Sequence, residues 1–425
     1  MLKLFLKLDN ILILLTALLF SIPDTRILGV SSYSILSIFL VLISLVHLKK
    51  FRRSIFDFNK PFFFLILFSI VVSVFYFSSN SFEQNRLILT KNVEILNMLL
   101  IVIYVLGIAK KREGRLLNIK LFIEVYFYAN LFYLLVKAFY PEIYFIFHQY
   151  DSSYVLSSLS TRESLLGYEP SYTGPLTYLL FLIYTSITKR TFSTYIFFFL
   201  TVYSFVFGAS KTALIMLGIY FIIKLYVLLT RSFKFNKLFS KFLLIIFFSV
   251  SSLYTYDYFD NKFGFSNFEM LTKADKYKII SWKTRSELIG ISLKIISYNP
   301  LGYGYGNSIS VISNYVEDNP NDIESFEIEQ ANWSARSPKS QLLEYISGGG
   351  FIFLILFYNM QIKRIFNLAG QRIYENEKFK YLSIFILLLV AISIGERIPY
   401  ILLSSMVFEI LIIKGEYTKK MNLDV

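Results

Sequence analysis

The chain has 425 residues and a formal net charge of +14, with 55% hydrophobic and 19% aromatic residues. Its mean hydropathy of +0.56 is too high for the balance of surface and core in a soluble domain. The positive charge does not indicate nucleic-acid binding, because the basic residues lie between apolar blocks rather than on one soluble face.

Apolar blocks recur along the chain, many of them about 17 to 22 residues long, which suffices to cross a hydrocarbon core of about 30 Å as a helix. Transmembrane strands would instead give alternating segments of about ten residues. We therefore predict an all-α, polytopic integral membrane protein. About twelve transmembrane helices are expected, at residues 11–22, 27–48, 61–77, 87–109, 121–140, 172–188, 192–208, 212–230, 242–256, 349–362, 381–394 and 399–413.

Lys and Arg clusters occupy every second connection between these blocks. By the positive-inside rule, those connections and both termini are predicted to be cytoplasmic, as an even number of spans requires. Residues 1–256 then hold helices one to nine with a shorter outer loop at 141–171. Residues 257–348 form a large extracytoplasmic loop, partly helical, and residues 349–425 hold the last three helices and a cytoplasmic tail.

On the fourth segment, Lys91 and Glu94 are spaced i, i+3, so they can pair on one helix face. The alternative is that Lys91, about one turn from the outer end, snorkels to the membrane surface. His47 and His148 have no neighbours at metal-ligand spacing, and the chain has no cysteine. No metal site and no cofactor are predicted.

The shorter outer loop ends in a charged motif that leads into the sixth segment. Arg162 precedes the turn Glu169-Pro170-Ser171, whose proline can start the following helix. From the residue types alone, a loop ion pair with a helix cap explains this motif, because interfacial charges are common.

A lysine occurs at the next outer turn, in Ser210-Lys211-Thr212-Ala213. A single exception of this kind is typical of a snorkelling side chain. The ammonium of Lys211 would also suit a phosphate at headgroup depth.

The large loop is basic in its first half, which includes Lys278 and Arg285, and acidic later. The apolar helical pattern that starts at Arg285 is predicted to end at Asn299-Pro300. The glycine run at 301–306 follows a helix rather than a strand, so we interpret it as a tight loop that needs glycine dihedrals and not as a nucleotide-binding loop.

The order of these motifs resembles the O-antigen polymerase and ligase superfamily, especially Wzy-type polymerases of bacterial surface polysaccharides. The resemblance covers roughly 162–353, through Glu-Pro-Ser at 169–171, Ser-Lys-Thr-Ala at 210–213, Asn-Pro-Leu-Gly-Tyr-Gly at 299–304 and the polar segment before the tenth helix. Lys211 stands where the family usually has arginine, which keeps the charge but loses bidentate geometry. The ligase branch typically has a histidine where residues 337–340 align, and its absence here favours a polymerase.

The resemblance implies a GT-C-type glycosyltransferase architecture in the bacterial cytoplasmic membrane, with the active site on the outer face. The implied reaction transfers a growing glycan from undecaprenyl pyrophosphate to a new lipid-linked oligosaccharide repeat unit, without a metal. The implied partners are that lipid-linked oligosaccharide and the bilayer, with a chain-length regulator and a flippase as further candidates.

On this resemblance, the predicted catalytic residues are Arg162, Glu169 and Arg285. Arginine forks suit the oxygens of a pyrophosphate leaving group, and Glu169 would act as a base or position the acceptor. The predicted residues for binding pyrophosphate and glycan are Lys211, Tyr172, Lys278, Arg336, Lys339 and Arg397.

Two alternatives stay open at this point. One is a ligase that moves the glycan to another acceptor, and the other is a flippase or other transporter of lipid-linked sugars. Transporters often show paired halves and charges at the membrane midplane, whereas the polar residues here favour the outer loops.

Overall fold

The computed structural model describes residues 8–22, 26–27, 30–31, 35–36, 38–42, 59–76, 82–107, 112–140, 142–143, 165–166, 170–206, 210–230, 275–320, 340–370, 375–395 and 398–421. Helices make up most of this part of the chain. They are α2 (Leu8–Ser21), α5 (Lys60–Tyr76), α6 (Phe82–Gly107), α7 (Arg112–Phe139), α10 (Pro170–Ile187), α11 (Phe192–Val206), α12 (Lys211–Thr230), α14 (Asp275–Tyr298), α15 (Ser308–Asp318), α17 (Gln341–Gly370), α18 (Glu375–Ile394) and α19 (Tyr400–Met421).

The predicted all-α architecture is confirmed in these residues, apart from one short strand pair. Strands β1 (Arg26–Ile27) and β2 (Val30–Ser31) pair antiparallel, with Ile27 opposite Val30. The prediction of a helix from residue 27 onward is therefore wrong at its start, because this pairing satisfies backbone groups in an extended turn. Residues 35–36 and 38–42 are helical.

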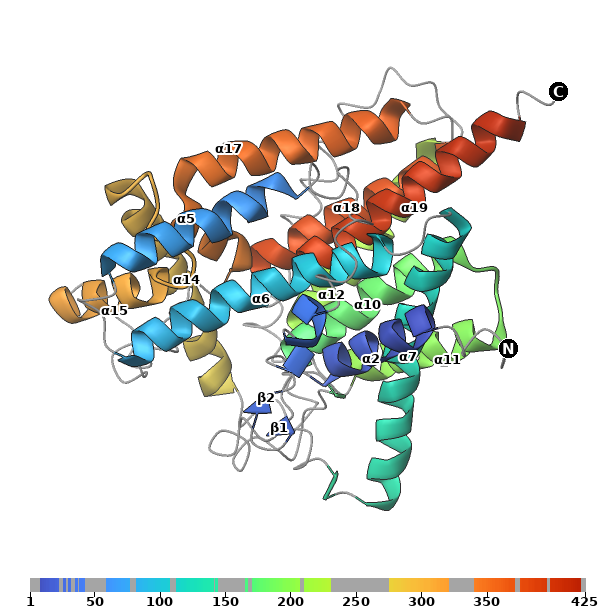
Figure 1. Ribbon diagram of the computed structural model, residues 1–425, viewed down its shortest axis with the longest axis horizontal. Coiled ribbons are helices and arrows are strands. Elements are labelled where there is room, and N and C mark those ends of the chain that lie inside the picture. Colours follow the sequence, from blue (N-terminus) through green and yellow to red (C-terminus); the bar gives the residue numbers. More distant parts are fainter. Residues whose placement is uncertain are drawn as a thin grey trace.

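The helices form an elongated bundle, with α14, α15 and α5 toward one end and α2, α7 and α11 toward the other (Figure 1). One large apolar core joins most of the helices and includes Ile13, Val102, Phe122, Ile183 and Leu403. A smaller cluster, built on Leu288 and Ile312, packs α14 against α15.

Three described helical stretches are long and apolar enough to cross a membrane, namely Gln84–Leu106, Glu113–Phe139 and Gln341–Leu368. Shorter apolar helices are Asn10–Ser21, Lys60–Val72, Phe192–Phe205 and Thr212–Tyr226. On α11, large apolar side chains face outward, among them Phe192, Tyr195, Phe198 and Phe199. These features support a membrane protein. The count of twelve spans and their orientation stay predictions, and the ninth predicted segment, 242–256, lies outside the described residues.

Helix α17 reverses direction, which the sequence did not predict. Gln341 contacts Ile398, and Gln361 contacts the hydroxyl of Tyr400, so both ends of a twenty-residue stretch meet the same turn. In one straight helix those glutamines would be roughly 30 Å apart at 1.5 Å per residue. The chain turns at Gly350, whose φ of 62° and ψ of −160° interrupt the helix (Figure 1). The predicted tenth helix at 349–362 is thus only the start of the segment after this turn.

The described part of the large loop packs against the bundle rather than standing apart from it. Helix α14 ends at Tyr298, which confirms the stop predicted at Asn299-Pro300, although it begins ten residues before Arg285. The glycine run follows directly, and its packing on α5, α6 and α17 helps to form the pocket described next.

Candidate functional site

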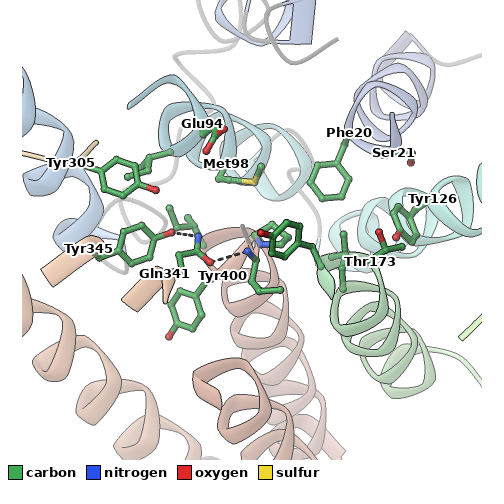
Figure 2. A pocket seen from close by; sticks show the side chains of 16 residues that line it. Phe20, Ser21, Glu94, Met98, Tyr126, Thr173, Tyr305, Gln341, Tyr345 and Tyr400 are labelled. Atoms are coloured by element: carbon green, nitrogen blue, oxygen red, sulfur yellow. Dashed lines mark hydrogen bonds between the residues drawn. The ribbon is translucent and has the colours of Figure 1, made fainter. Parts of the chain in front are cut away.

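A pocket lies where several helices meet near the start of α19. It encloses about 80 Å³ and opens between α6, α7, α10 and the first part of α17 (Figure 2). The side chains that line it come mostly from tyrosines and aliphatic residues, with a few polar groups: Phe20, Ser21, Glu94, Ile95, Met98, Tyr126, Tyr172, Thr173, Leu176, Tyr305, Gln341, Tyr345, Ile398, Pro399, Tyr400 and Ile401. An apolar wall with a few placed polar groups is the usual composition of a ligand site.

Gln341 holds two walls of the pocket together. Its Oε1 accepts a hydrogen bond from the Ile398 amide at 2.8 Å, and its Nε2 donates to the Tyr345 hydroxyl at 2.6 Å (Figure 2). The backbone N–H of Gln341 also donates a hydrogen bond to the Gly395 carbonyl at 3.0 Å. The first turn of α17 is therefore fixed to the connection between α18 and α19, where backbone groups have no helical partners of their own.

The glycine loop brings Tyr305 to the pocket. Gly302, Gly304 and Gly306 have φ of 92°, 84° and 87°, which confirms the prediction that this run needs glycine dihedrals. The Tyr305 amide donates to Ser69 Oγ at 2.7 Å. Asn92 Nδ2 donates to the Tyr305 carbonyl at 3.1 Å, so α5 and α6 both hold the loop.

Lys91 forms an ion pair between helices. Its Nζ lies 3.0 Å from Glu344 Oε1, and the two side chains are only 11% and 6% exposed. The interpretation of Lys91 as a snorkelling side chain is therefore wrong. The predicted pairing with Glu94 also gives way to a partner on the first part of α17.

Two of the motifs found in the sequence pack directly on each other. A Cβ built on Gly174 would lie 3.0 Å from Ser210 Cβ and 3.2 Å from Ala213 Cβ, so α10 and α12 approach closely here. Ser210 also caps α12, because its Oγ accepts from the Ala213 amide at 3.3 Å. Upstream, the Leu166 amide donates to Asn130 Oδ1 on α7 at 3.0 Å, which anchors the loop motif to the bundle.

The elements that carry these motifs thus converge: α10 supplies Tyr172, the glycine loop supplies Tyr305, and α17 supplies Gln341 to one pocket. Residues 196–358 match the O-antigen ligase family. The match confirms the resemblance to the O-antigen polymerase and ligase superfamily and includes α12, α14, the glycine loop and the pocket end of α17. No curated protein sequence matches the chain.

The match to this family suggests a membrane enzyme of glycan transfer, of the O-antigen ligase or polymerase type. Within the described residues, no group of three or more His, Cys, Asp or Glu side chains is arranged to hold a metal ion.

Of the residues predicted from the resemblance to O-antigen polymerases, Tyr172 is the one whose side chain the structure describes, and it lines the pocket. For Lys211, Lys278 and Arg285 only the backbone is described: Lys211 begins α12, and the other two lie in α14. Five further predicted residues lie outside the described part of the chain, namely Arg162, Glu169, Arg336, Lys339 and Arg397.

Three of these residues are close in sequence to residues that line the pocket. Arg397 immediately precedes Ile398, Lys339 is two residues before Gln341, and Glu169 is three residues before Tyr172. Consecutive Cα atoms are 3.8 Å apart, so these separations are short along the chain.

Several pocket residues were not predicted as site residues, chiefly Tyr305, Gln341, Tyr345 and Glu94. The polar segment before the tenth helix contains Gln341 and Tyr345, and their position inside a family motif was the available signal. Glu94 had been considered only as a partner for Lys91.

Proposed function

We propose that this protein is a repeat-unit polymerase of a bacterial surface polysaccharide, located in the cytoplasmic membrane. It transfers the growing glycan from undecaprenyl pyrophosphate to a new lipid-linked oligosaccharide repeat unit at the outer face. The observation that carries this proposal is the convergence of separate family motifs on one pocket, through Tyr172, Tyr305 and Gln341.

The sequence before α17 supports polymerase over ligase. Residues 337–340 read Ser-Pro-Lys-Ser, where the ligase branch typically has a histidine. The ligase reading stays as the second candidate, because the matched family is described as O-antigen ligase.

The chemistry requires stabilisation of a pyrophosphate leaving group as the bond from its oxygen to the anomeric carbon breaks. We assign this role to Arg162 and Arg285, whose guanidinium groups can donate two hydrogen bonds to phosphate oxygens, with Lys211 assisting. Lys278, Arg336, Lys339 and Arg397 add positive charge in the same outer segments. Glu169 accepts the proton of the attacking hydroxyl or orients the acceptor.

The proposal is tested by reconstitution of purified protein in liposomes with lipid-linked repeat units extracted from cells that lack it. A polymerase produces a ladder of lipid-linked oligomers on a gel. A ligase produces no ladder and transfers the glycan only when another acceptor is added, whereas a flippase moves the repeat unit across the bilayer without elongating it. Translocation without elongation would reject the proposed function.

A further inference from the structure

Glu94 is a carboxylate on the pocket wall that the proposed roles do not use. It lies one turn from Met98 on α6, and both side chains line the pocket (Figure 2). It is partly buried, and among the described residues its carboxylate has no hydrogen-bond or ion-pair partner. Since no described side chain pairs with this carboxylate, water or the hydroxyls of a ligand in the pocket can supply its hydrogen bonds.

The polar groups around Glu94 already have protein partners. Gln341 bonds to Ile398 and Tyr345, and Lys91 lies 3.0 Å from Glu344. The pair of Lys91 with Glu344 is neutral as a unit, and Glu94 is the charged side chain among the described residues that line the pocket. Among the described residues that line the pocket, no side chain is a lysine or an arginine.

This charge decides which end of the reaction the pocket serves. A pyrophosphate would be repelled by Glu94, and the described lining offers no cation to offset the repulsion. Sugar hydroxyls are neutral donors, and an ionised carboxylate accepts hydrogen bonds from them strongly. The pocket therefore suits the acceptor sugar and not the pyrophosphate of the donor.

The remaining walls also fit a sugar. The rings of Tyr305 and Tyr345 lie with centroids 5.4 Å apart, and both side chains line the pocket with Glu94. Tyrosine combines an apolar ring face with a polar tip, which matches the mixed apolar and hydroxylated surface of a sugar ring. The enclosed volume of about 80 Å³ is several times the roughly 10–15 Å³ that one water requires, so the edge of a terminal sugar can displace water there.

We propose that Glu94 binds a hydroxyl group of the acceptor's terminal sugar and so positions the acceptor for transfer. The inference rests on the proposed glycan transfer, and it assigns the acceptor end of that reaction to the pocket between α6 and α17. Glu94 is a binding residue in this proposal, distinct from the cations that stabilise the leaving group.

The test replaces Glu94 with glutamine, which keeps the shape of the side chain and removes its charge. In liposomes with a preformed lipid-linked oligomer as donor, the single lipid-linked repeat unit is titrated as acceptor. We expect Glu94→Gln to raise the acceptor KM about tenfold, equivalent to about 1.4 kcal/mol, with kcat little changed. The matched control is Glu377→Gln on α18, which removes the same charge from a carboxylate that lies 2.7 Å from Lys414 on α19. The acceptor KM of this control variant should stay within about twofold of the wild-type value.

A second measurement separates this inference from the proposed function. The repeat oligosaccharide, released from its lipid by mild acid, is titrated into purified protein by calorimetry, with no turnover. Weaker binding to Glu94→Gln than to wild type and Glu377→Gln supports the sugar pocket, even if the reconstituted protein does not polymerise. Equal binding and an unchanged acceptor KM, at wild-type elution from a sizing column, would overturn it. Absence of binding to wild type would also overturn it.

Discussion

Replacing Gly302 with alanine tests the contact between the glycine loop and the turn of α17. Gly302 has a φ of 92°, and a Cβ there would lie 2.5 Å from the Gly350 nitrogen and 2.6 Å from the Gly348 oxygen. Backbone strain of this kind costs about 1–2 kcal/mol, and overpacking against rigid atoms about 1–3 kcal/mol. We therefore expect Gly302→Ala to destabilise the protein by about 2–5 kcal/mol.

The matched control is Gly290→Ala, because a Cβ on this glycine of α14 meets nothing within 4 Å. That change should stabilise the helix by about 0.5–1 kcal/mol. Both variants are purified in detergent, and the temperature at which the monodisperse elution peak is lost is compared with that of wild type. A wild-type midpoint for Gly302→Ala would refute the close packing of the loop on α17.

Three further outcomes are expected. Lys91→Met should cost about 3–5 kcal/mol in the same heating assay by removing the cation 3.0 Å from the buried Glu344 carboxylate, and adding Glu344→Gln should restore part of the loss. A double variant no more stable than the single one would contradict the ion pair. Arg285→Ala should lower transfer by about 10²- to 10³-fold and abolish surface polymer on an immunoblot at normal membrane levels, with partial recovery in Arg285→Lys. Normal polymer from the alanine variant would remove Arg285 from the site. A topology reporter fused at Asn319 should be extracytoplasmic and one at Asn367 cytoplasmic, and finding both on one side would remove a span.

Local patterns predicted the helices well. Apolar blocks separated by basic connections gave the positions of helices such as α7 and α18, because lipid-facing helices must be apolar along their length. The end of α14 at Tyr298 followed from the proline two residues later, which cannot continue a helix. The positive φ of Gly302 was expected because three glycines lie close together in the short run 301–306.

Long-range features escaped prediction because no local pattern encodes them. The predicted tenth helix begins at residue 349, next to the turn at Gly350, but hydropathy does not show that the helical segment before it runs back along the bundle. The pairing of Lys91 with Glu344 and the contact of Gln341 with Ile398 likewise join residues that are far apart in the sequence. The pocket is consequently a product of tertiary packing, and single motifs indicated only some of its walls.

Buried charges show the same limit. Arg115 belongs to the basic connection between the fourth and fifth predicted helices, yet it is 2% exposed and forms an ion pair with Glu409 on α19. Arg364 is likewise buried and donates to the Tyr400 hydroxyl at 3.4 Å. The positive-inside rule assigns basic connections to the cytoplasmic side of the membrane, but it says nothing about the partners of single residues. The partners of Arg115 and Arg364 lie far away in the sequence and could not be identified from it.

The reversal of α17 at Gly350 also bears on how long glycans are handled. The segment before the turn, 341–349, extends roughly 14 Å at 1.5 Å per residue and begins at Gln341, which contacts Ile398. Gln361 and Arg364 bond to the hydroxyl of Tyr400 and so back the pocket with side chains. If the protein is the proposed polymerase and binds its acceptor there, the acceptor presents only its tip, and every round of transfer meets the same short end, however many units the donor already carries. We would then expect the length of the polymer to follow from competition between the next transfer and release of the product, not from a measurement made inside the pocket.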